Sequence, residues 1–336
     1  MRRWSAHLGI LSLLASVIVV VGTAPVGASQ TCEGSGNGNV NGAPKVGQAK
    51  GDFDGNGVAD QVKLFFDQFG TGDVYTKVIL DNGYKAVFHH GQSLASTGIL
   101  KVRDVDQDGD AEIFILNSLG AGANQADILF FLDCELQQPV DGEGSTVAPR
   151  IGGDGGGAEQ NGLDCYAPSA GGKGITTWHG VFSNMTFKTT VERNEYRIKD
   201  HANGGPAELI LTHQDEFILG DGDPKIEYIN WFNCGPRPKC DGKRANIQGT
   251  PFKDIINGTG GKDVIVGLAS KDVINGKRGA DRICGGGGND VIEGKRGADR
   301  MFWQGGKDIL RGGAGNDFAH GGRGNDTCTA EVKKSC

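Results

Sequence analysis

The strongest constraint in this sequence is an aspartate that returns every nine residues through the last third of the chain. Nine aspartates keep this register without a slip: Asp254, Asp263, Asp272, Asp281, Asp290, Asp299, Asp308, Asp317 and Asp326. A mostly apolar residue stands two positions after each of them, as in Ile256 and Ile283. Glycines precede the aspartate, most completely in the segments 285–290, 312–317 and 321–326. Such a period indicates a solenoid built from short repeated units.

The spacing within each repeat also predicts a chemistry. A glycine-rich turn tolerates positive φ angles, so backbone carbonyls can point into one cavity. The aspartate adds a carboxylate, and the residues after it form a short strand whose apolar side chain turns inward. Hard oxygen ligands in flexible number are what calcium accepts. The unit resembles the RTX, or hemolysin-type, calcium-binding nonapeptide (G-G-x-G-x-D-x-U-x). That resemblance implies a parallel β-roll over 247–330, with two nonapeptides per turn and calcium between the turns.

The resemblance also implies which side chains bind calcium, although some loops depart from the pattern. The expected ligands are Asp263, Asp281, Asp290, Asp299, Asp308, Asp317 and Asp326. The segments 267–272 and 303–308 have lost some of the loop glycines. Lys262, Lys271 and Lys307 directly precede an aspartate, where the best repeats have asparagine. A lysine beside a ligand lowers calcium affinity by like-charge repulsion. We therefore expect calcium at the better loops and weak or no binding at others.

Stacking of the repeats predicts a cluster of positive charge. Segments eighteen residues apart lie above one another in a β-roll, which brings 276–281 beneath 294–299. The resulting basic ridge consists of Lys277, Arg278, Lys295 and Arg296, with Arg282 and Arg300 on the adjoining strand face. This ridge either holds an anionic polymer of the cell envelope or is simply a solvated face.

Two further acidic loops lie upstream, at 52–60 and 104–112. In both, oxygen-bearing side chains occupy positions 1, 3, 5 and 9, glycine occupies the bend, and position 7 offers a backbone carbonyl, as in a calcium loop. The expected ligands are Asp52, Asp54, Asn56 and Asp60 in the first loop and Asp104, Asp106, Asp108 and Glu112 in the second. Neither loop continues as an EF-hand, because position 12 is Lys63 or Ile115.

An apolar, strand-like segment follows each acidic loop. This combination resembles the FG-GAP/VCBS repeat, the calcium hairpin of integrin-type propeller blades, and the two loops are 52 residues apart, near one blade length. The resemblance implies an antiparallel β domain over 29–235, as a partial propeller, since only two blades are visible and a full propeller needs four or more. A metal-free acidic turn is the alternative for each loop. The expected fold class is all-β, with this domain followed by the parallel β-roll.

The start of the chain predicts export. Arg2 and Arg3 precede an apolar run from Leu8 to Val21 and small residues up to Ala28. This is the pattern of a secretory signal peptide over 1–28, and the run is short for a membrane span; an N-terminal anchor is the alternative. The remaining divisions are 29–235, a linker at 236–246, the roll at 247–330 and a tail at 331–336.

The cysteines and the charge agree with an extracellular location. Eight cysteines, an even number, favour disulfides in an exported chain. Cys234–Cys240 and Cys328–Cys336 are the pairs expected first, because each closes a short loop. A zinc site is disfavoured because no C-x-x-C pair exists. The formal net charge of −7 argues against wholesale nucleic-acid binding and suits cation binding.

No catalytic motif is recognisable in the sequence. Neither H-E-x-x-H nor G-x-S-x-G occurs, and the histidines are scattered. We therefore expect a secreted calcium-binding protein that acts as an extracellular binding or structural module. The alternative is a secreted hydrolase with a C-terminal RTX folding domain, by analogy with proteases and lipases that carry such repeats, which is a weak basis for a function.

Overall fold

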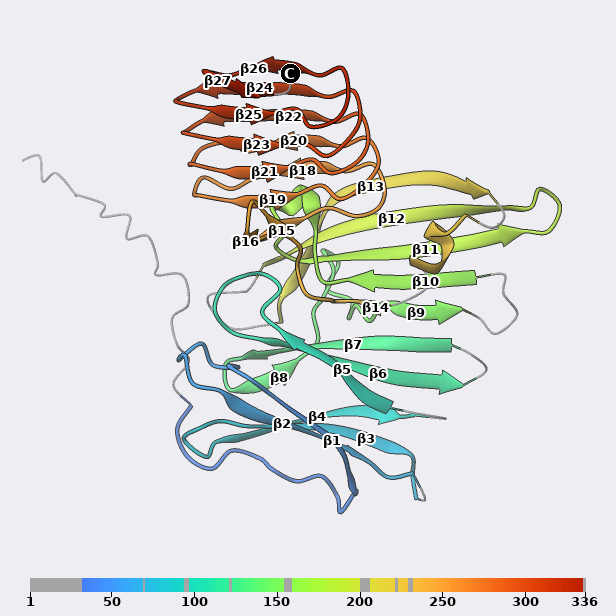
Figure 1. Cartoon of the computed structure of the whole chain (residues 1–336). Coiled ribbons are helices and arrows are strands. Elements are labelled where there is room, and N and C mark those ends of the chain that lie inside the picture. Colours follow the sequence, from blue (N-terminus) through green and yellow to red (C-terminus); the bar gives the residue numbers. More distant parts are fainter. Residues whose placement is uncertain are drawn as a thin grey trace, which may run out of the picture.

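The computed structural model describes residues 32–68, 70–93, 97–120, 123–153, 159–199, 206–220, 223–228 and 232–334. The fold is all-β, as expected, with antiparallel sheets followed by a parallel solenoid (Figure 1). Within these ranges the helical segments are the 3₁₀ turn η1 (Pro168–Ala170) and α1 (Lys225–Tyr228). Neither these nor any other helix in the described part of the chain could span a membrane. The expected signal peptide lies outside the described residues.

The first sheet is an antiparallel meander of four strands. In spatial order these are β1 (Lys45–Gly51), β2 (Asp60–Phe66), β3 (Asp73–Ile79) and β4 (Lys85–Gln92). Alternate residues of β2 are buried, which is the two-residue period of a strand with one face on the core. The first acidic loop, 52–60, connects β1 to β2.

Ten strands form the second sheet, along the path β13-β12-β11-β10-β9-β7-β6-β5, with β8 beside β7 and β14 beside β10. Their bounds are β5 (Thr97–Arg103), β6 (Glu112–Gly120), β7 (Ala123–Leu132), β8 (Glu135–Gln137), β9 (Arg150–Gly153), β10 (Glu159–Asp164), β11 (Ile175–Ser183), β12 (Lys188–Lys199), β13 (Glu208–Gly220) and β14 (Phe232–Asn233). The second acidic loop, 104–112, connects β5 to β6. Each acidic loop therefore joins the first two strands of an antiparallel series.

The nonapeptides form a solenoid of two parallel sheets, entered through the hairpin β15 (Lys239–Cys240) and β16 (Lys243–Arg244). One sheet contains β17 (Ile247–Gln248), β19 (Val264–Val266), β21 (Arg282–Cys284), β23 (Arg300–Phe302), β25 (Phe318–His320) and β27 (Val332–Lys334). The other contains β18 (Ile255–Asn257), β20 (Val273–Asn275), β22 (Val291–Arg296), β24 (Ile309–Ala314) and β26 (Thr327–Thr329). Ile256 pairs with Ile274 and Ile283 with Met301, one turn apart. The expected two nonapeptides per turn are confirmed.

A single column of apolar side chains fills the solenoid. Its members are the residues two positions after each aspartate: Ile256, Ile265, Ile274, Ile283, Ile292, Met301, Leu310, Ala319 and Cys328, all at most 9% exposed. Burying each large aliphatic side chain is worth about 1.5–3 kcal/mol relative to exposure. No single turn encloses such a column, so each turn depends on its neighbours.

The first turn of the roll lies beside the end of the ten-stranded sheet that contains β11 to β13 (Figure 1). An aromatic cluster packs between them. Phe252, in the first repeat, has its ring centroid 5.0 Å from that of Trp178 on β11 and 4.8 Å from that of Phe217 on β13. Tyr228 packs edge-on against Trp178 at 5.9 Å. These rings pack the first repeat against β11 and β13.

The disulfides correct one expectation from the sequence. Cys234–Cys240 is wrong: Cys234 bonds to Cys165, Cys240 bonds to Cys284, and a third bridge joins Cys32 to Cys134. The reason is strand pairing. Parallel contact of β10 with β14 sets Asp164 beside Asn233, so the next residue on each strand is a cysteine facing its partner. Cys328 is disulfide-bonded, whereas Cys336, its expected partner, lies outside the described residues.

The Cys240–Cys284 bridge should be a major support of the roll. It ties β15 to β21 across 44 residues of sequence, and the chain-entropy relation gives about 4 kcal/mol for a loop of that length. We expect the double variant Cys240→Ser/Cys284→Ser to melt at a clearly lower temperature in circular dichroism with calcium present. Calcium stoichiometry should stay unchanged, because neither cysteine belongs to a glycine loop. An unaltered melting temperature would contradict this role.

Candidate metal centres

The repeat aspartates form two straight stacks along the roll. The first stack is Asp254, Asp272, Asp290, Asp308 and Asp326; the second is Asp263, Asp281, Asp299 and Asp317. In both, the backbone N–H of one aspartate donates to Oδ1 of the aspartate one turn later, at 2.8–3.0 Å. Glu331 closes the second stack by accepting the N–H of Asp317 at 2.8 Å. Oδ1 of each later aspartate therefore links its own turn to the preceding turn by a hydrogen bond.

The other carboxylate oxygen is buried without a hydrogen-bond donor. Within the described residues this holds for Oδ2 of Asp272, Asp281, Asp290, Asp299, Asp308, Asp317 and Asp326. The first six of these side chains are at most 1% exposed. Leaving a buried polar atom unsatisfied costs about 1–3 kcal/mol, and more for a charged group. A row of such oxygens fits cations lying beside it.

The glycine loops bring carbonyl oxygens to the same place. A Cβ on Gly276 would lie 2.7 Å from Oδ2 of Asp281 and 2.9 Å from the carbonyl oxygen of Gly294, one turn later. The carboxylate and the next turn's carbonyl thus converge on the space that a side chain would fill. Only glycine leaves that space open, which explains why most repeats begin with glycine.

Six loops share one backbone shape, and three of them place a residue other than glycine at positive φ. In the loops beginning at 267, 276, 285, 294, 312 and 321, the second and fourth residues both have positive φ. Leu268 (φ 83°) and Ser270 (φ 72°) adopt this conformation without being glycine. Asp272, which was not expected as a ligand, therefore lies in a loop of the same conformation as those of Asp281, Asp290, Asp299, Asp317 and Asp326. The loop beginning at 303 keeps positive φ only at its fourth residue, Gly306.

In the first two loops, protein N–H groups donate to the aspartate Oδ2, which has no donor in the later loops. The backbone N–H of Thr250 donates to Oδ2 of Asp254 at 2.6 Å, and that of Thr259 donates to Oδ2 of Asp263 at 2.7 Å. Asn246 donates from Nδ2 to Oδ1 of Asp263 at 2.8 Å. Asp263 thus differs from the other expected ligands. Threonine at the second loop position is the sequence signal for this difference.

A buried arginine caps the first stack. Arg193 on β12 is 1% exposed, and its Nη1 donates to Oδ1 of Asp254 at 2.5 Å. Asp215 on β13 binds the same guanidinium at 2.7 and 2.8 Å. The guanidinium pairs with the aspartate of the first turn. Among the described residues, no basic side chain forms a salt bridge with a later aspartate of the stack. The contact of Arg193 with Asp254 joins the ten-stranded sheet to the roll.

The first acidic loop gathers three of its four expected ligands as charged groups. Asp52, Asp54 and Asp60 have carboxylate oxygens within 4.8 Å of one another. Asn56 joins them through its amide, which donates to Oδ2 of Asp54 at 3.1 Å. Burial, chiefly, raises the pKa of Asp54 and Asp60, and the neighbouring carboxylates add to it. Such crowding of negative charge suits a divalent cation.

In the second acidic loop, the carboxylates that cluster differ by one residue from the expected ligands. The clustered carboxylates are Asp106, Asp108, Asp110 and Glu112, again within 4.8 Å. Asp110 replaces Asp104, which instead accepts the N–H of Gln107. The sequence pattern assigned only a backbone carbonyl to position 7, so it missed the Asp110 side chain. Burial, followed by the charge of Asp106, raises the pKa of Glu112 well above its usual value.

The two acidic loops nevertheless share one internal geometry. The last acid of each accepts the backbone N–H of the second loop residue: Phe53 to Asp60 at 2.9 Å and Val105 to Glu112 at 2.7 Å. Phe53 and Val105 are both fully buried. The second loop also touches the roll entrance, because Gln107 donates to the carbonyl oxygen of Asn246 at 3.3 Å.

The basic ridge is partly neutralised within the molecule. Lys295 pairs with Glu293. On the adjoining face, Asp241 accepts from Nε of both Arg282 and Arg300, at 3.2 and 3.1 Å. In the described part of the chain, Lys277, Arg278 and Arg296 form no salt bridge.

A buried hydroxyl–imidazole–carboxylate chain lies between the two antiparallel sheets. Oγ1 of Thr76 lies 2.8 Å from Nε2 of His90, and Nδ1 of His90 lies 2.5 Å from Oδ2 of Asp127. The order matches that of a hydrolase triad. However, Thr76 is 0% exposed, so its hydroxyl cannot reach a substrate. The chain holds β3, β4 and β7 together.

Removing the Arg193 guanidinium should destabilise the junction. Arg193→Gln leaves Asp254 buried without a counter-charge, a change that costs about 3–5 kcal/mol for buried ion pairs. Denaturant unfolding in calcium measures this loss. The matched control is Arg197→Gln, an exposed arginine on the same strand, which should change stability by less than about 0.5 kcal/mol. Equal stability of the two variants would show that the roll does not need this cap.

Comparison with protein families identifies the repeats. Residues 248–283, 266–301 and 304–331 match the RTX calcium-binding nonapeptide repeat (4 copies). The comparisons with curated proteins and with solved structures gave no match. RTX repeats are typical of secreted proteins, and the disulfides indicate an oxidising environment. Residues 248–331 of this chain contain RTX calcium-binding repeats, and this region folds into a β-roll.

Proposed function

We propose that this protein is a secreted calcium-binding protein whose β-roll is stabilised by calcium and which acts outside the cell as a binding or structural module. The observation that carries the proposal is the row of seven buried Oδ2 atoms without donors in the two aspartate stacks. Calcium accepts carboxylate and carbonyl oxygens in variable number. Bound in the loops, it would supply the positive charge that these oxygens lack.

The loops should differ in affinity. Those of Asp281, Asp290, Asp299, Asp317 and Asp326 keep positive φ at both loop positions. The loop of Asp272 shares that shape, but Lys271 opposes a cation there. The loop of Asp308 is expected to be weaker, since Trp303 stands where most loops begin with glycine and Lys307 precedes the aspartate. Asp263 is expected to contribute least, because its oxygens already accept protein donors.

The two acidic loops are proposed as additional calcium sites in an FG-GAP/VCBS-like domain over 29–235. Two observations support this proposal. Asp60 and Glu112 each accept the backbone N–H of the second residue of their loop, and each loop connects the first two strands of an antiparallel series. Segment 236–246 would then connect this domain to the roll at 247–330, followed by the tail at 331–336. Binding of an anionic envelope polymer to the basic ridge stays a prediction.

Calcium would act on folding by mass action. Extracellular calcium modules typically bind at roughly 10⁻⁴–10⁻³ M, so they load outside the cell. A ligand that binds only the folded state stabilises it. Arg193 and the aromatic cluster hold the first turn without calcium, which suggests that the roll forms outward from the ten-stranded sheet.

Calcium should raise the melting temperature of the mature chain and increase its strand signal in far-ultraviolet circular dichroism. Each site contributes about 1.4 kcal/mol at a calcium concentration ten times its dissociation constant. Calorimetric titration of Asp299→Asn should show fewer bound ions than the wild type. Asp263→Asn, in the same stack and at the same repeat position, is the matched control and should keep the wild-type stoichiometry. Identical melting with calcium and with chelator would refute the proposal.

The calcium-free roll should lose stability as the pH rises. Burial, with the charge of Asp254, raises the pKa of Asp272 from 3.8 to about 9, and burial raises that of Asp281 to about 7. Because these folded-state values exceed the unfolded ones, the folded chain binds more protons, and unfolding becomes easier between pH 3.8 and about 9. Calcium favours the ionised carboxylates and should flatten this slope. Melting curves across this range, in chelator and in calcium, measure both slopes. A chelated protein that gains stability across the range would contradict the expectation.

A further inference from the structure

A basic cavity lies where the ten-stranded sheet, the connecting segment and the roll entrance meet. Its volume is about 440 Å³, and its lining includes Lys101 and Arg103 from β5 and Arg237 and Arg244 from the connecting segment. Asp104 is the single acidic residue of the lining. We propose that this cavity is a binding site for an oxyanion, namely a sulfate, phosphate or carboxylate group.

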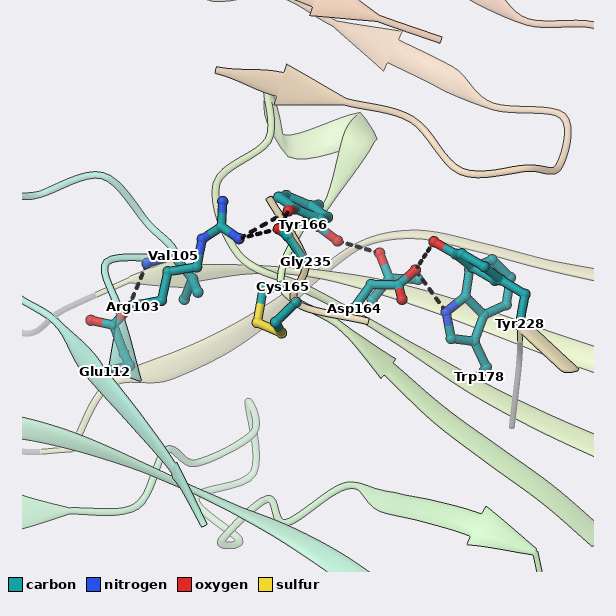
Figure 2. The surroundings of a disulfide bond; sticks show 11 residues. Arg103, Val105, Glu112, Asp164, Cys165, Tyr166, Trp178, Tyr228 and Gly235 are labelled. Atoms are coloured by element: carbon teal, nitrogen blue, oxygen red, sulfur yellow. Dashed lines mark hydrogen bonds between the residues drawn. A yellow bond between two sulfur atoms is a disulfide. The ribbon is translucent and has the colours of Figure 1, made fainter. Parts of the chain in front are cut away.

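The guanidinium groups of Arg103 and Arg237 both pack against the ring of Tyr166. The Cζ atoms of Arg103 and Arg237 lie 4.7 and 5.4 Å from the ring centroid of Tyr166. Nη1 of Arg103 donates to the Tyr166 hydroxyl at 2.9 Å and to the carbonyl oxygen of Gly235 at 3.3 Å (Figure 2). Nη1 of Arg237 donates to the carbonyl oxygen of Asn246 at 2.9 Å. Every one of these acceptors is neutral.

The cavity therefore keeps a net positive charge, because four basic residues and one acidic residue, Asp104, line it. Among the described residues, neither Arg103 nor Arg237 forms a salt bridge with a carboxylate. Nε of Arg237 is buried and has no hydrogen-bond acceptor there. Burial and the nearby charge of Arg103 also lower the pKa of Arg237. Buried donors normally have acceptors, so an external anion is the missing partner.

The cavity is preorganised for such a partner. Tyr166 and Gly235 each directly follow a cysteine of the Cys165–Cys234 bridge, which holds the two segments together (Figure 2). Guanidinium forks bind carboxylate, sulfate and phosphate oxygens through two parallel hydrogen bonds. The volume lies within the range of small-molecule sites, about 300–1,000 Å³. An oxyanion carried by a small molecule or by one residue of a polymer would fit.

Calorimetric titration of the calcium-loaded mature chain at low ionic strength tests the site. Sodium sulfate, sodium phosphate and a uronate monosaccharide are the probes, and sodium chloride is the baseline. We expect saturable binding of at least one oxyanion, and the strongest probe identifies its class. Arg103→Gln and Arg237→Gln should each weaken binding about tenfold or more. Arg237→Lys, which keeps the charge but loses the fork, should recover only part of the affinity.

The matched control is Arg278→Gln, which removes one positive charge from the basic ridge, as each cavity variant removes one from the cavity, and should leave binding unchanged. Melting temperature in calcium reports whether each variant is folded. If Arg103→Gln is unfolded, Arg244→Gln decides, because that side chain is exposed and its loss should still weaken binding. The proposal is overturned if the wild type binds none of the three oxyanions. It is equally overturned if the ridge variant loses binding while the cavity variants keep it. This site does not depend on the calcium proposal.

Discussion

The roll depends on a carboxylate that does two things at once. Each later aspartate uses Oδ1 to accept the N–H of the turn before it and leaves Oδ2 buried without a donor. The hydrogen bond fixes the register between turns, while the ionised carboxylate carries a cost that a bound cation or a proton removes. Stability of the stack and affinity for calcium therefore come from the same side chain. Under the proposed function, the calcium concentration around the protein sets how completely the roll is folded.

A stack of this kind needs a first turn that is satisfied without calcium. The chain provides one through threonine donors, the Asn246 amide and the Arg193 guanidinium. The guanidinium comes from β12, so the ten-stranded sheet completes the solenoid at the end where no earlier repeat exists. Phe252 of the first repeat packs against Trp178 of the same sheet. The two parts of the molecule are therefore coupled by charge and by apolar packing at one junction.

The same hydrogen bond closes both acidic loops of the antiparallel part. Phe53 and Val105 each bury a side chain and donate an N–H to the closing acid of an acidic loop. The loops end at different distances from the roll, and the second one reaches its entrance through Gln107. The basic cavity lies at the same junction. Sites of opposite charge thus adjoin where the sheet, the connecting segment and the solenoid converge.

The sequence by itself determined the period, the parallel stacking, the inward apolar column and most of the clustered carboxylates. It could do so because these depend on spacing within one repeat, and a repeat meets only its neighbours. Only the tertiary structure decided which cysteines pair, that Arg193 faces Asp254, that Asp110 replaces Asp104, and that Arg103 and Arg237 share Tyr166. Most of these contacts join residues tens of positions apart on different strands. Their distances follow from sheet order and register, which local composition does not contain.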